Sequence, residues 1–111
     1  MATVGSAGRL AAAVQAALPR SRFTPLVGQR LTVSGPSGTV RARLEEVRDL
    51  AGCPASDERS FALELRCPRG SAVTNGIHTV SHPQLESVSL YLGPVERGTN
   101  GPLLEAVVNQ V

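Results

Sequence analysis

Apolar and polar residues alternate in short runs along most of the chain after residue 23, and Gly, Pro, Asn and Ser separate the runs. A period of two is typical of β-strands that bury one face, and the separating residues favour turns. The pattern predicts a mainly β fold of about six antiparallel strands, closed as a small barrel or packed as a two-layer sandwich. The predicted strands cover residues 30–34, 39–47, 60–67, 76–81, 87–92 and 103–109.

The first two strands form the clearest predicted hairpin. They flank residues 35–38, Gly-Pro-Ser-Gly, where proline fixes one backbone angle and the glycines allow a tight turn. Continued alternation along the second strand places Val47 on its polar face. A β-bulge near Glu45 and Glu46 would return Val47 to the core, so the pattern predicts a bulge there.

Two strands supply most of the predicted core. The strand at 60–67 is expected to be half-buried, with Cys67 on its apolar face. The strand at 87–92 is expected to end before Pro94, because proline interrupts a sheet. The solvent face of the first strand is expected to carry Ala62, Glu64 and Arg66. The predicted inward side chains of the two strands are Phe61, Leu63, Leu65, Val88, Leu90 and Leu92.

The N-terminal segment follows a helical pattern instead. Residues 6–18 are rich in strong helix formers, begin at Ser6, a good N-cap, and precede Pro19. They predict one N-terminal α-helix of about three turns that ends before Arg20. The domain organisation that follows is a helix and linker over residues 1–22 and a β domain over residues 23–111.

An apolar stripe runs along the predicted helix, with Leu10, Val14 and Leu18 spaced four residues apart. Amphipathicity leaves two interpretations open: the helix closes the end of its own barrel, or it docks on a protein partner or a second copy of the chain. We expect it to serve association more than folding, so that removing residues 2–20 would leave the β core intact.

Composition narrows the classes of function. The 111 residues suit one domain, the 41% apolar and 18% charged fractions are those of a globular protein, and no apolar run approaches the ~20 residues of a membrane helix. All 11 basic residues are arginine, which indicates a GC-rich bacterial source, and 9 acidic residues leave a net charge of +2. This balance argues against a dedicated nucleic-acid binder.

The chain has two cysteines, Cys53 and Cys67. The apolar segment before Pro19 is interrupted by Gln15 and is followed by no clear cleavage site, so it makes a poor secretory signal. We therefore expect a cytoplasmic protein whose thiols are reduced rather than joined as a disulfide.

The candidate metal ligands are Cys53, Cys67, His78 and His82. Their spacing lacks the C-x2-4-C knuckle that usually fixes two zinc ligands on one turn, so we expect no metal and no other cofactor. His82 precedes Pro83 in a predicted turn, where a hydrogen bond between a ring nitrogen and a backbone group explains it.

No arrangement typical of catalysis is present in the sequence. It contains no G-x-S-x-G elbow and no Gly-rich loop that opens a helix after a strand. Glu45, Glu46 and Asp49 form the only acidic cluster, which we interpret as a solvated face or a set of ion pairs. The expected ion-pair partners are Arg41, Arg43 and Arg48. We expect no enzyme and assign no catalytic or cofactor-binding residue.

Six motifs resemble a bacterial family of small all-β domains of unknown function. They are FTPLVGQRLTV (23–33), LEEVRDL (44–50), SFALELRCP (60–68), HTVSHPQL (78–85), SLYLGPV (89–95) and LLEAVVNQ (103–110). The family pattern has larger residues at the positions of Leu31, Leu65 and Val108, and glycine in place of Cys67. The resemblance covers residues 23–110 and implies a small β domain with no assigned activity, associated in some members with phage-tail-like proteins.

These observations favour a non-enzymatic protein-binding or assembly module. Its partner would be another protein or a second copy held through Leu10, Val14 and Leu18, with no nucleic acid and no membrane involved. The competing hypothesis is a small ligand- or metal-binding barrel, or an enzyme, with His78 and His82 near its site.

Overall fold

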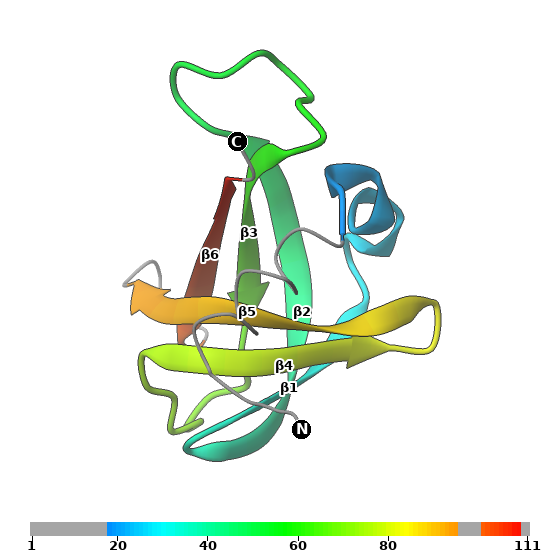
Figure 1. The fold of residues 1–111 in the computed structure, drawn as a ribbon. Coiled ribbons are helices and arrows are strands. Elements are labelled where there is room, and N and C mark those ends of the chain that lie inside the picture. Colours follow the sequence, from blue (N-terminus) through cyan, green and yellow to red (C-terminus); the bar gives the residue numbers. More distant parts are fainter. Residues whose placement is uncertain (1–17, 96–100, 110–111) are drawn as a thin grey trace, which may run out of the picture.

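The fold is a closed barrel of six antiparallel strands (Figure 1). The computed structural model describes residues 18–95 and 101–109. The strands follow one another around the barrel in the order β1-β2-β3-β6-β5-β4. Their bounds are β1 Arg30–Gly35, β2 Gly38–Asp49, β3 Ser60–Arg66, β4 Gly76–His82, β5 Leu85–Val95 and β6 Leu103–Asn109. The predicted β class is confirmed, and of the two predicted architectures the barrel is present.

The β1–β2 hairpin has the predicted turn and the predicted bulge. Gly35 and Gly38 are paired at its end, and Gly38 has a φ of 119°, a left-handed conformation that favours glycine. The register between β2 and β3 shifts between Leu44 and Glu46, which leaves Glu45 as the extra residue. Val47 then lies opposite Leu63 and packs against the core, as the alternation required.

All six predicted inward residues of β3 and β5 are buried. The prediction for the other face of β3 is wrong, because Ala62 and Glu64 are buried as well. β3 lies between β2 and β6, and Arg48 of β2 extends over it to pair with Glu64 and with Glu105 of β6. Long side chains on the neighbouring strands therefore help to cover a face that alternation alone assigns to solvent.

β5 is longer than predicted, because it continues through Pro94 to Val95. Its pairing with β6 covers only Gly93, Pro94 and Val95. Proline is tolerated near the end of a strand, where few ladder hydrogen bonds depend on its missing N–H.

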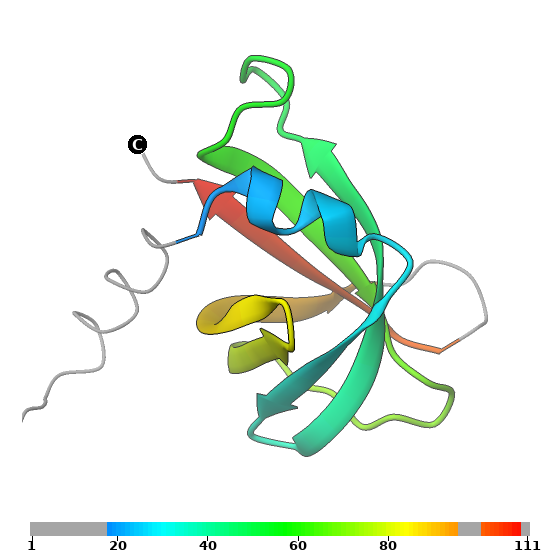
Figure 2. The ribbon, with the colours of Figure 1, turned by 90° about the vertical axis from the view of Figure 1, so that its right-hand side faces the viewer.

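The described N-terminal residues form two short 3-10 turns, η1 (Arg20–Arg22) and η2 (Thr24–Leu26), where a linker was expected. Figure 2 shows both turns packed alongside the strands. Leu18, Phe23 and Leu26 belong to the hydrophobic core of the barrel. The predicted α-helix lies outside the described residues except for its last residue, and so do Leu10 and Val14.

Backbone and side-chain contacts also hold η1 in place. The backbone N–H of Arg20 donates to the carbonyl of Glu58 (2.9 Å), and its guanidinium pairs with Asp49. Arg22 pairs with Glu86 at the start of β5. The segment before β1 therefore connects the β2–β3 loop to β5. No helix among residues 18–95 and 101–109 is long and apolar enough to cross a membrane.

Candidate anion-binding site

Arginines of three neighbouring strands lie in a row on the outer wall of the barrel. Arg30 of β1 is paired directly with Arg43 of β2, and Arg43 is paired in turn with Arg66 of β3. Arg41 lies on the same face of β2 as Arg43, because residues two apart in a strand share a face. These side chains point outward because Leu31, Ala42, Leu44 and Leu65, which alternate with them, are buried in the core.

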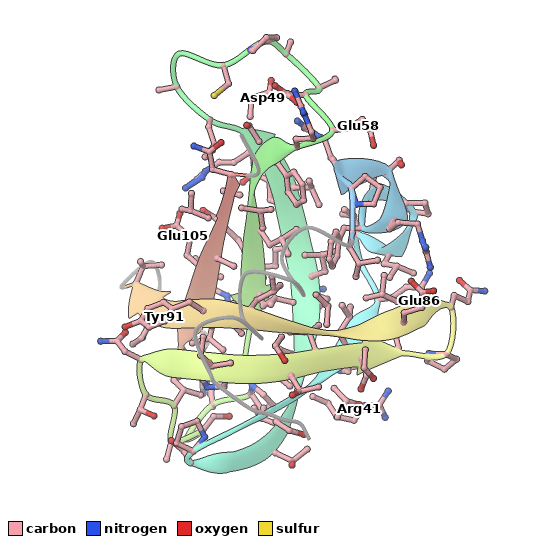
Figure 3. All side chains as sticks on the ribbon, viewed as in Figure 1. Arg41, Asp49, Glu58, Glu86, Tyr91 and Glu105 are labelled. Atoms are coloured by element: carbon pink, nitrogen blue, oxygen red, sulfur yellow. The ribbon has the colours of Figure 1, made fainter. Side chains whose placement is uncertain are left out.

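The row borders a surface cavity of about 270 Å³. Four guanidinium groups and one carboxylate line it, a local charge of +3. The lining residues are Arg30, Arg41, Arg43, Glu45, Arg66, Cys67 and Pro68. We call the four arginines the arginine cluster. Figure 3 places Arg41 at the end of the barrel opposite to Asp49 and Glu58.

Glu45 pairs with two arginines of the cluster. Its Oε2 accepts hydrogen bonds from Nη2 of Arg43 (3.2 Å) and Nε of Arg66 (3.2 Å), and its Oε1 accepts one from Nη2 of Arg66 (3.4 Å). The hydrogen bond from Arg66, with a smaller one from Arg43, holds the pKa of Glu45 below its ordinary value against the opposing effect of desolvation. Glu45 is thus a resident anion of the cluster.

The four arginines of the cluster differ in how firmly they are held. Arg66 is fixed on two sides, because it also donates to the carbonyl of Gly101 (3.0 Å). Within the part of the chain that the structure describes, no acidic side chain forms an ion pair with Arg30 or Arg41. Like charges placed directly opposite each other destabilise a sheet. A bound anion would offset this repulsion, and guanidinium groups bind carboxylates and phosphates through paired hydrogen bonds.

His78, one of the candidate metal ligands, is held by a local hydrogen bond. Nδ1 of His78 donates to the carbonyl of Gly76 (2.8 Å), and the buried ring occupies the space beside Gly35, where an added Cβ would lie 2.1 Å from a ring carbon. Among the described residues, His, Cys, Asp and Glu do not gather in groups of three or more that could hold a metal ion. A second cavity, of about 150 Å³, is lined by His78 together with Ser37, Thr39 and Ser71.

The interpretation of His82 as a turn residue is confirmed. The backbone N–H of Gln84 donates to Nδ1 of His82 (3.0 Å), and Nε2 donates to Oε1 of Gln29 (2.9 Å). Both ring nitrogens of His82 therefore have partners that fix the turn between β4 and β5.

Two members of the predicted acidic cluster, Glu45 and Asp49, form ion pairs with partners that differ in part from the expected ones, and Glu46 is exposed. Glu45 pairs with Arg43 as expected and also with Arg66. Asp49 pairs with Arg20, and it accepts a hydrogen bond from the backbone N–H of Ser56 (2.9 Å). This backbone hydrogen bond, followed by the one from Arg20, lowers the pKa of Asp49. Arg48, expected beside these acids, pairs with the carboxylates of Glu64 and Glu105.

Both cysteines are free thiols, and we expect them to differ sharply in reactivity. Cys67 is buried, and desolvation raises its pKa against the smaller opposing effect of Arg66, so little of it is thiolate at neutral pH. Cys53 is half-buried in the β2–β3 loop. Native protein treated with iodoacetamide at pH 7.5 and analysed by peptide mass spectrometry should therefore be alkylated at Cys53 well before Cys67. Equal labelling rates would contradict the burial of Cys67.

Sequence reasoning missed the arginine cluster as a site. The alternation does place Arg41 and Arg43 on one outward face, which was the available signal. Their neighbours on β1 and β3 depend on strand register, which no local pattern specifies.

The fold and the cluster define a small closed β-barrel with a positively charged hollow in its wall. The family model described as "Domain of unknown function (DUF6916)" matches residues 18–108. The chain therefore belongs to this family, which confirms the expected membership of a family of unknown function. The matched range begins at Leu18, whose side chain is in the core, rather than at Phe23. None of the curated proteins and none of the solved structures compared with the chain matches it.

Proposed function

We propose that this protein is a non-enzymatic protein-binding module and that the arginine cluster binds an acidic segment of its partner. The observation that carries the proposal is the direct opposition of Arg30, Arg43 and Arg66 on three neighbouring strands, two of them in contact with a single resident carboxylate. Glu45 neutralises only part of this charge, and an additional anion would offset the repulsion between Arg30 and Arg43, which favours a role in binding.

An acidic protein segment suits the cluster better than a nucleic acid. Two of the three aromatic residues, Phe23 and Phe61, are buried, so only Tyr91 is available to stack on a base. Neighbouring strands lie about 4.8 Å apart, so a row across three strands spans about 10 Å. Two or three carboxylates of an extended peptide can contact a row of this length, whereas a nucleic-acid backbone calls for a longer basic surface.

The proposed setting is a bacterial assembly, which the sequence resemblance implies. We place this assembly in the cytoplasm because the segment before Pro19 makes a poor secretory signal, and the two free thiols support this location. The hydrogen bonds at Nδ1 of His78 and at both ring nitrogens of His82 support a non-enzymatic role for both residues. Self-association or partner binding through Leu10 and Val14 stays a prediction, whereas Leu18 packs in the core of its own barrel.

A fluorescein-labelled hexaglutamate peptide tests the proposal by fluorescence anisotropy. We expect the wild type to bind it and the Arg30→Gln/Arg41→Gln variant to bind it about tenfold more weakly, because two charge-assisted contacts are lost. Arg30 faces Arg43, so removing its charge should leave the free energy of unfolding unchanged or slightly higher. Binding should weaken as salt is raised from 50 to 500 mM.

Arg59→Gln is the matched control. It removes an exposed arginine from the β2–β3 loop, which Figures 1 and 3 place at the opposite end of the barrel from Arg41. Its affinity for the peptide should stay within about twofold of wild type, since charges more than a Debye length apart are largely screened. A loss of binding free energy in Arg59→Gln that is half the loss in the double variant, in proportion to the charge removed, would show that net charge alone governs binding. Binding of a single-stranded oligonucleotide without binding of the peptide would overturn the choice of a protein partner.

A further inference from the structure

Glu45 occupies a special position in the arginine cluster. It is the extra residue of the β-bulge, since Leu44 pairs with Leu65 and Glu46 pairs with Glu64 across the register shift. β-Bulges often re-aim a side chain next to a functional site. Here the bulge lies at the cavity that the arginines line, and the carboxylate of Glu45 is the only acidic group among the lining residues.

The two ion pairs of Glu45 differ in how firmly they are held. Arg66 contacts both carboxylate oxygens, also donates a hydrogen bond to the carbonyl of Gly101, and has a side chain that is 18% exposed. Arg43 contacts one oxygen only, and its side chain is 56% exposed. An exposed single contact is worth little, so Arg43 can turn from Glu45 to another anion at small cost while Arg66 stays in place.

We propose that Glu45 is a built-in competitor for the acidic ligand. This inference rests on the proposed function and assigns the regulation of the same site. In the free protein Glu45 engages Arg66 and Arg43. In the complex a carboxylate of the partner takes the place of Glu45 at Arg43 and also contacts Arg30 and Arg41, while Arg66 retains Glu45. The resident carboxylate thereby weakens binding of single acidic groups and favours segments with several carboxylates.

The test is Glu45→Gln, assayed with the hexaglutamate peptide. Glutamine has nearly the same shape as glutamate and keeps an oxygen acceptor for Arg66, but it lacks the charge that holds Arg43. We expect binding to tighten by about three- to tenfold, because Arg43 is released and one repelling carboxylate is removed. In an Arg43→Gln background, the gain from Glu45→Gln should fall below about twofold.

Glu46→Gln is the matched control. Glu46 is the neighbouring exposed residue on β2, so this variant changes the net charge by the same amount without touching the cavity lining. It should alter the affinity by less than about twofold.

Glu45→Asp serves as a second variant if Glu45→Gln does not fold, because it keeps the charge and shortens the reach to Arg43. It should tighten binding by about twofold.

The outcomes separate the two hypotheses. Peptide binding by the wild type that is unchanged or weakened in folded Glu45→Gln would overturn the competitor role and make Glu45 a positioning residue for Arg66. Equal gains in Glu45→Gln and Glu46→Gln would overturn it as well, because net charge would then explain both. If neither the wild type nor Glu45→Gln binds the peptide, the proposed function itself fails.

Discussion

Leu63→Ala is expected to lower the free energy of unfolding by about 2–5 kcal/mol. Leu63 lies in the middle of β3, opposite Val47 of β2 and Ala106 of β6, and its side chain is 1% exposed. Truncation removes three buried carbon atoms and leaves a cavity, since strands paired on both sides cannot collapse far into the space. Urea denaturation followed by circular dichroism measures the change.

Val107→Ala is the control for this prediction. Val107 is on β6 next to Ala106, but its side chain is 58% exposed on the outer face of the barrel. Its truncation should change the free energy of unfolding by about 0.5 kcal/mol or less, as is usual for surface positions. A loss below about 1 kcal/mol for Leu63→Ala would contradict the burial of Leu63 in the core.

The sequence predicts the strands and the β1–β2 hairpin well, because those features depend on local chemistry. Gly35 and Gly38 specify the turn. Strict alternation would place Val47 on the polar face of β2, so an apolar residue at that position requires the bulge that the β2–β3 register contains. Each inference needs only the side-chain period of a strand and the conformations that glycine permits.

Features that depend on neighbouring strands could not be predicted in this way. Alternation assigns Glu64 to solvent, but its burial depends on the position of β3 between β2 and β6 and on the reach of Arg48. The choice between barrel and sandwich also depends on closure, because β4 pairs with β1 as well as with β5. Neither the burial of Glu64 nor the closure of the barrel can be recognised from the sequence of one strand alone.

In the candidate site, too, local sequence reveals some features and strand pairing alone determines others. The sequence draws attention to histidines and cysteines because their chemistry is distinctive, whereas the structure gives His78 and His82 hydrogen bonds that hold the backbone and the neighbouring Gln29. The arginine cluster arises from pairing between residues far apart in the chain, such as Arg43 and Arg66. Arginines so far apart in the sequence form no recognisable motif, so only the register of the strands reveals the cluster.

We expect the N-terminal unit, residues 1–22, to serve association more than folding, but Leu18, in its described part, packs in the core of the barrel. Leu18, Phe23 and Leu26 are buried in the same core as the strands. Pro19 and Pro25 allow only short turns here, because each is tolerated only near the start of a helical segment. The expectation that residues 2–20 can be removed without loss of stability therefore conflicts with the burial of Leu18.

Phe23→Ala is expected to lower the free energy of unfolding by about 3–5 kcal/mol without changing the mass of the native particle. Phe23 is buried, and its ring packs against that of Phe61 on β3, with ring centroids 5.9 Å apart and a tilt of 48° between the rings. Removing it opens a cavity between η2 and the barrel. Denaturant unfolding and light scattering give the two readouts, and Val27→Ala, at an exposed position of the same segment, is the control.

A double-mutant cycle with Phe61→Leu isolates the contact between the two rings. The coupling should amount to about 0.5–1.5 kcal/mol, the range for tilted aromatic pairs at this separation. A loss below about 1 kcal/mol for Phe23→Ala, together with a smaller native mass, would instead assign the segment to an interface between molecules. A large loss at constant mass would establish that residues 18–26 close their own barrel.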